Sequence, residues 1–237
     1  MVRFRCDEPK KLGTKDSILQ HALHDAGAIV RLTANVFADL RSRMGEIVVS
    51  YPPHIHRIEP PFIVGTAFFP GGCGLWCGLE HFAPAPTLFP ETPVMFVAHN
   101  YAGANAFERL RTKGGEGGFW WRDIVVPLLR GAGLDPDRAF FTNALMGLKD
   151  GPSVGKMNAP RQFESECSRF LGEQIRIIQP SGIVAFGADA YQRVRLVTSE
   201  VAKCIHPSAR EFIPLETRAE RVRARAAELL VSKSLRR

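Results

Sequence analysis

Three polar residues that follow short apolar runs carry groups suited to binding one pyrimidine base. Asn100 ends the segment "VMFVAHN", Asn143 ends "AFFTN", and His206 begins "HPS" directly after "VAKCI". An amide presents a hydrogen-bond donor and an acceptor side by side, which matches the Watson–Crick edge of a pyrimidine. An imidazole can donate to an oxygen that gains negative charge, and a preorganised donor of this kind contributes about 2.7–4 kcal/mol. Together these groups predict a pocket for a base extruded from its stack.

An aromatic cluster follows the glycines of "KGGEGG" and adds a stacking surface. It comprises Phe119, Trp120 and Trp121. A base stacked on an aromatic ring gains about 1–3 kcal/mol. Adjacent helical residues face different directions, so at least one of the three rings is expected to pack in the core.

The elements that must position these residues have the pattern of a parallel sheet. Four apolar runs have the length of strands: Val94–Ala98, Ala139–Thr142, Gly182–Phe186 and Val201–Ile205. Stretches with apolar residues at helical spacing separate several of these runs, and this alternation is typical of βαβ units. Parallel strands deliver their carboxyl ends to one edge of the sheet, where ligands bind. Asn100, Asn143 and His206 are therefore expected to meet at that edge.

The regions outside these runs differ from them in composition and in the spacing of apolar residues. Residues 16–43 carry apolar residues at helical spacing with a break at Gly27, and residues 52–93 are crowded with proline and glycine, which predicts loop with short extended pieces. Residues 216–230 have the pattern of a basic amphipathic helix. We divide the chain into an N-terminal extension of residues 1–92, packed on the core, and a domain of residues 93–237.

Composition and charge limit the class of protein and of partner. The 237 residues are 45% hydrophobic and 23% charged, as in an ordinary globular chain, and the net charge of +7 suits a polyanionic partner. No apolar run approaches the roughly 20 residues of a membrane span. The first residues, "MVRFRCDEPKK", have no apolar export core, so we expect a cytoplasmic protein with reduced cysteines and no membrane partner.

Five segments in order resemble motifs of the uracil-DNA glycosylase superfamily. They are "VMFVAHNYAG", "GGFWW", "FFTNAL", "APRQFESECSRFLGEQIRIIQPSGIVAFGADA" and "HPSAR". The resemblance implies a three-layer α/β/α fold with a central, mostly parallel four-stranded sheet. It also implies hydrolysis of the N-glycosidic bond of uracil, or a related deaminated base, in DNA.

The resemblance also assigns roles to single residues. Asn100 takes the position that places the attacking water, Phe119 stacks on the base, Asn143 reads uracil, and His206 faces the uracil O2. The remaining substrate-binding candidates are His99, Tyr101, Ser208 and Arg210. The implied enzyme is a monomer that needs no metal or organic cofactor, and its partner is damaged DNA.

Several positions depart from the family pattern. Tyr101 stands where proline is usual, and His99 stands where glutamine, glutamate or isoleucine is common. An amide at position 100 can orient a water but cannot take its proton, and general base catalysis typically contributes about 10²–10⁴-fold. The alternative reading is a weak or inactive homologue that binds nucleic acid or a protein. In the best-known branch of the family, a leucine near the position of Arg210 fills the space that the extruded base leaves in the DNA stack. Three alternatives stay open for Arg210: it fills this space, it holds a phosphate, or it lies on the surface.

The cysteines resemble part of the set found in the iron–sulfur branch of the family. Cys167 takes the place of the last ligand, and Cys73 and Cys77 lie near the place of the first pair. No cysteine stands at the position of the third ligand of that set. The alternatives are a cluster or zinc site completed by a histidine, and reduced buried cysteines, which we favour. His54 and His56 have metal-like spacing but no evident partner in sequence. An unrelated nucleotide-binding α/β protein is a third reading, although the sequence has no Walker-type loop.

Overall fold

The computed structural model describes residues 31–58, 74–78, 86–101, 103–113, 120–151 and 156–207. Its elements, in chain order, are α2 (Thr33–Ile47), β1 (Ile55–His56), β2 (Val94–Asn100), α3 (Ala104–Lys113), η1 (Trp121–Val125), α4 (Val126–Gly131), η2 (Pro136–Arg138), β3 (Ala139–Leu145), β4 (Leu148–Lys149), α5 (Arg161–Ile178), β5 (Gly182–Phe186), α6 (Gly187–Arg195) and β6 (Ala202–Cys204).

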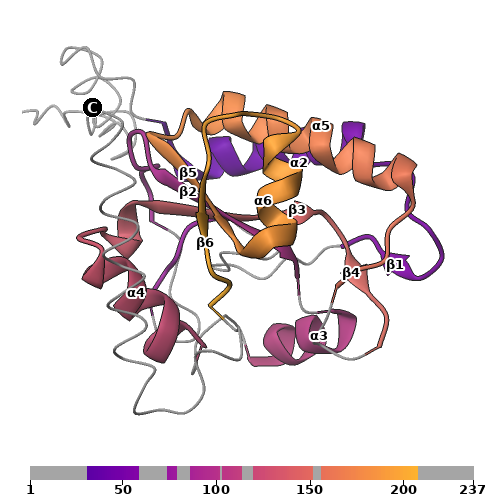
Figure 1. The fold of residues 1–237 in the computed structure, drawn as a ribbon, viewed down its shortest axis with the longest axis horizontal. Helices are drawn as coiled ribbons and strands as arrows, with labels where there is room; N and C mark the ends of the chain where they lie inside the picture. The colour runs from indigo at the N-terminus through magenta and orange to yellow at the C-terminus, as the bar shows by residue number, and fades with distance from the viewer. Residues whose placement is uncertain are drawn as a thin grey trace, which may run out of the picture.

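The central sheet has four parallel strands in the order β3-β2-β5-β6. Parallel neighbours require crossover connections, and helices supply them between β2 and β3, between β3 and β5, and between β5 and β6 (Figure 1). The carboxyl ends of all four strands therefore lie at one edge. The predicted α/β fold with a parallel four-stranded sheet is confirmed.

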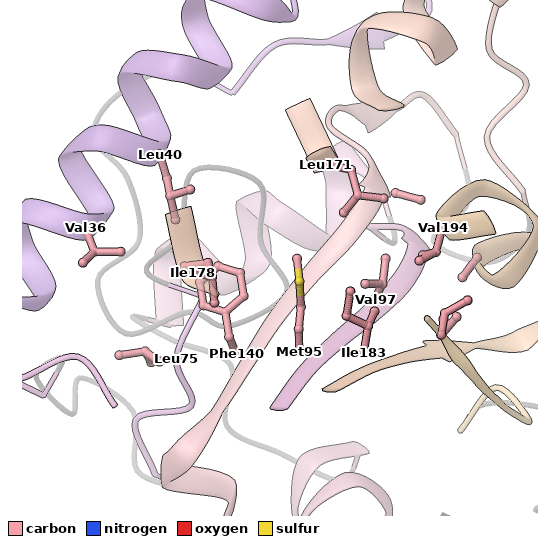
Figure 2. Packing of buried hydrophobic residues seen from close by; sticks show 14 of the residues in the cluster. Val36, Leu40, Leu75, Met95, Val97, Phe140, Leu171, Ile178, Ile183 and Val194 are labelled. Atoms are coloured by element: carbon pink, nitrogen blue, oxygen red, sulfur yellow. The ribbon is translucent and has the colours of Figure 1, made fainter. Parts of the chain in front are cut away.

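Helices cover both faces of the sheet because apolar residues alternate along its strands. In β2, Met95 and Val97 belong to a buried cluster with residues of α2, α5 and α6, whose side chains fill the space between strands and helices in Figure 2. Phe96 and Ala98 belong to a second cluster, with residues of η1 and α4. Successive side chains of a strand point to opposite faces, so these two clusters form the two interfaces of a layered α/β/α arrangement.

Helix α2, the described helix that precedes the sheet, packs on α5. Val36 and Leu40 of α2 share the buried cluster with Leu171 and Ile178 of α5 (Figure 2). The predicted boundary between residues 92 and 93 stays a prediction. Gly27 and residues 216–230, for which a helix break and a basic helix were expected, lie outside the described residues.

Two strands extend further than the apolar runs indicated. β2 continues to Asn100 and β3 continues to Leu145, and these two residues are paired in register. A polar side chain does not end a strand, because the backbone makes the ladder hydrogen bonds. Asn100 and Asn143 therefore belong to the strands that they were expected to follow. A small antiparallel pair, β1 with β4, lies outside the main sheet. None of the described helices is long and apolar enough to span a membrane.

Candidate active site

Asn143 lies inside the sheet, near the carboxyl end of the edge strand β3. It is paired in register with Ala98 of β2 and is only 1% exposed. Asn143 is two residues after Phe141 on β3, so the two side chains face the same side of the sheet. Phe141 packs there in the cluster beneath η1 and α4. The rigid backbone of two paired strands thus fixes the position of the amide that was predicted to read a base.

Asn100, the last residue of β2, has its carboxamide held by three protein groups. Its Oδ1 lies 2.7 Å from Nδ1 of His99 and 3.3 Å from the backbone nitrogen of Met157. Its Nδ2 donates to the carbonyl oxygen of Tyr101 at 2.6 Å. The amide is therefore anchored at both ends, although the side chain is only half-buried.

His99 connects this amide to helix α6. Nε of Arg193 lies 3.4 Å from Nε2 of His99, on the side of the ring away from Asn100. Burial lowers the pKa of His99; the hydrogen bond to Asn100 acts against this, and the nearby positive charge of Arg193 adds to the lowering. At neutral pH the ring is therefore uncharged.

Residues of α5, α6 and the segment before α5 surround this pair. Arg193 also binds the Glu164 carboxylate of α5 through its terminal nitrogen. One turn earlier on α6, Asp189 accepts a hydrogen bond from Lys156 at 2.7 Å. Met157, whose N–H reaches Asn100, is the next residue. Helix α6 therefore holds the end of β2 both directly and through the segment that contains Met157.

His206 lies two residues beyond β6, at the same carboxyl edge. Burial lowers its pKa, and a positive charge on His99 would lower it further. The ring is therefore a neutral donor or acceptor at pH 7. Gly187, the residue directly after β5, packs against it: a Cβ atom at position 187 would lie 3.3 Å from Cβ of His206.

Two of the three residues expected to meet have the same parity along their strands: Asn100 follows Phe96 and Ala98 in alternation, and Asn143 follows Phe141, and these three apolar residues belong to the cluster on the η1–α4 face. His206 lies beyond the end of β6, at the same edge of the sheet and beside Gly187. In the same layer, Trp121 is 4% exposed and packs against Phe141 with ring centroids 5.0 Å apart. This confirms that at least one ring of the aromatic segment lies in the core.

The other predicted site residues are placed differently or lie outside the described residues. Tyr101 is 7% exposed and packs in a cluster with Phe107 and Ala106 of α3. Its predicted contact with the base stays a prediction. Phe119, Ser208 and Arg210 lie outside the described residues, so their roles are untested.

The described cysteines, Cys77, Cys167 and Cys204, lie in separate parts of the core. Cys167 is buried in the cluster between α5 and Met146, and burial raises its pKa to about 12. Cys77 packs at the margin of a different cluster, and Cys73 lies outside the described residues. Within the described ranges, no three His, Cys, Asp or Glu residues are grouped as a metal site. His56 pairs with Asp150, and His54 with the carbonyl of Asn158.

Sequence reasoning missed the groups that hold Asn100. Arg193, Glu164 and Met157 are distant from it in sequence, and nothing in their spacing marks them as neighbours. The one available signal was the pair Asp189 and Arg193, which are four residues apart on a helix and so share a face. Their partners were not predictable.

Comparison with known proteins identifies the family. The family model described as the uracil DNA glycosylase superfamily matches residues 88–230. None of the curated proteins matches the chain. The family match covers more than half of the 237 residues and supports a glycosylase-type hydrolase with DNA as its substrate. The chain therefore belongs to the uracil DNA glycosylase superfamily.

Proposed function

We propose that the protein is a DNA repair glycosylase that flips uracil, or a related deaminated base, out of DNA and hydrolyses its N-glycosidic bond. The observation that carries this proposal is the position of Asn143 and His206 at the same edge of the sheet: Asn143 is on the outer strand β3, and His206 is two residues beyond the other outer strand, β6. Three strand spacings separate those strands, about 14 Å between their axes. One flat base with a side chain reaching in from either side would fit across that distance.

Each residue has a role in the proposed reaction. The bond between C1′ and the base nitrogen breaks with its electron pair going to the base, the oxygen of a water molecule bonds to C1′, and the proton that this water loses ends on the departing base or in solvent. His206 would donate to the base oxygen that gains negative charge. Asn143 would select uracil against cytosine, because the wrong edge leaves buried polar groups without partners. Asn100 would place the water, and Phe119 would stack on the base.

A second function is favoured by the chemistry at position 100. An amide cannot accept the proton of the attacking water, and Oδ1 of Asn100 already receives two hydrogen bonds. A general base contributes about 10²–10⁴-fold where one is present. A slow or inactive homologue that binds nucleic acid or a protein is therefore the alternative.

A cleavage assay separates the two functions. Purified protein is incubated with uracil-containing single-stranded and duplex oligonucleotides, which are then treated with alkali to break the strand at abasic sites. Breaks that are lost in His206→Ala and Asn143→Ala, but kept in the exposed control variants His54→Ala and Asn35→Ala, would support the enzyme. Binding without breaks would support the alternative. The cytoplasmic location and the monomeric state stay predictions.

A further inference from the structure

The hydrogen-bonding capacity of Asn100 is almost fully used by the protein itself. A carboxamide oxygen has two lone pairs and its nitrogen has two hydrogens. The oxygen receives the Met157 N–H and the His99 ring, and one hydrogen of Nδ2 goes to the Tyr101 carbonyl. Within the described part of the chain, one N–H of Asn100 is left.

These contacts fix which way the amide points. A backbone N–H can only donate and a backbone carbonyl can only accept, so the end near Met157 must be the oxygen and the end near Tyr101 must be the nitrogen. His99 must then donate from Nδ1 to that oxygen. In a neutral imidazole the other nitrogen carries a lone pair, and this is the atom that faces Arg193.

Arg193 is well placed to enforce this tautomer. Its side chain is 19% exposed, and its guanidinium reaches the Glu164 carboxylate with one nitrogen and His99 with another. An arginine has donors only, so the His99 nitrogen beside it must be unprotonated. The planar fork that joins two partners at once is a geometry that lysine does not offer.

We propose that Arg193 is a positioning residue for Asn100, acting through His99, and that it makes the carboxamide present an N–H donor, and no acceptor, to the site. This inference rests on the proposed function for the role of Asn100. The N–H would hold the attacking water by its oxygen, and the hydrogens of that water would point elsewhere. Asn100 would thus fix the position of the nucleophile without taking part in proton transfer.

Protonation of His99 would break the chain of contacts at its Arg193 end. The charged groups around the ring are Arg193 and Asp189 of α6 and Lys156 before α5, with Glu164 of α5 beyond Arg193, and the titratable ring of His206 lies after β6. Once Nε2 carries a proton it can no longer accept from Arg193, and two positive charges face each other. The arrangement therefore requires neutral His99.

The first test reads the tautomer of His99 by ¹⁵N NMR of the imidazole in the full-length protein, and it needs no catalysis. The expected spectrum at pH 7.5 has the proton of His99 on Nδ1, and the Asn100 side-chain N–H signals shift in both Arg193→Lys and Arg193→Gln. A proton on Nε2 in the wild type overturns the proposal. Unchanged Asn100 signals in both variants also overturn it. If the wild type cleaves no DNA, the proposed function fails but this spectrum still decides the inference.

The second test compares kinetics on a uracil-containing oligonucleotide. Misplacement of a reacting group can cost about 10²-fold, so kcat is expected to fall by up to about that factor in Arg193→Lys, with KM nearly unchanged. The control is Arg195→Gln, an exposed arginine on the same helix that stacks over Tyr191. Wild-type kcat in Arg193→Lys would show that only the charge matters and overturn the proposal. A rise in KM with a smaller salt dependence would instead place Arg193 on a DNA phosphate, and would overturn it as well.

Discussion

Gly187 and His206 are in close contact at the carboxyl edge of the sheet, where a Cβ atom at position 187 would lie 3.3 Å from the Cβ of His206. Gly187 also has φ of +87°, a backbone conformation that other residues adopt only with strain. A side chain at position 187 would therefore crowd the histidine as well as strain the backbone.

The first prediction concerns Gly187→Ala. The left-handed backbone is expected to cost about 1–3 kcal/mol of unfolding free energy, and His206 would have to shift by a few tenths of an ångström to make room for the new methyl group. Urea unfolding and the cleavage assay measure the two effects. Gly182→Ala is the matched control at the other end of β5, because it has no atom within 4 Å of the added Cβ. Equal stability and activity in both variants would contradict the prediction.

The second prediction concerns the protonation of His206. Burial lowers its pKa from the ordinary 6.5, so the unfolded chain binds a proton at a higher pH than the folded protein does. Stability is therefore expected to fall as the pH drops below about 6.5, and to level off below the folded pKa. NMR titration of the ring gives the pKa directly. His206→Ala should weaken the pH dependence, and a ring that titrates above 6.5 in the wild type would refute the argument.

The third prediction concerns Glu166, which ties the segment after α2 to α5. Its Oε2 accepts hydrogen bonds from the backbone N–H groups of Val49 and Ser50, both at 2.8 Å, and its Oε1 accepts from the Ser50 hydroxyl. In Glu166→Ala these partly buried donors would lose their acceptor, at a cost of about 0.5–1.5 kcal/mol for each hydrogen bond. Chemical denaturation of this variant beside Glu173→Ala, which removes only a surface ion pair with Arg176 on the same helix, measures the loss.

The same carboxylate has a pH signature of its own. Burial raises the pKa of Glu166, but the hydrogen bonds from Ser50, Val49 and Gln162 outweigh it, so the folded pKa lies below the ordinary 4.5. The stabilisation is present above pH 4.5 and is lost as the pH falls through the folded pKa. Glu166→Gln should remove this part of the acid sensitivity. A variant as acid-sensitive as the wild type would argue against the assignment.

The fourth prediction concerns the reactivity of Cys167. Burial raises the pKa of this thiol to about 12, and the thiolate is the reactive form. At pH 8 a thiol reagent is expected to leave Cys167 unmodified in the folded protein and to modify it once urea unfolds the chain. Half-buried Cys77 is the internal comparison. Peptide mass spectrometry identifies the labelled residue, and rapid labelling of Cys167 in the native protein would be the contrary result.

The main strands could be predicted from the sequence because apolar runs such as Gly182–Phe186 have strand length and are bounded by polar or glycine residues. Once those runs are parallel neighbours, the topology alone brings Asn100, Asn143 and His206 to one edge. The extent of β3 was not predictable, because backbone pairing with β2 carries the strand past the polar Asn143.

Short-range apolar patterns set the strands, so the order of residues along the chain was enough to predict that Asn100, Asn143 and His206 lie at one edge. The orientation of these side chains depends on tertiary packing. Met157 and Arg193 reach the end of β2 from 57 and 94 residues away, and such contacts depend on how α6 and the segment before α5 pack, not on any local pattern. For that reason the sequence could predict an amide at the site, but it could not predict the direction in which the Asn100 side chain points.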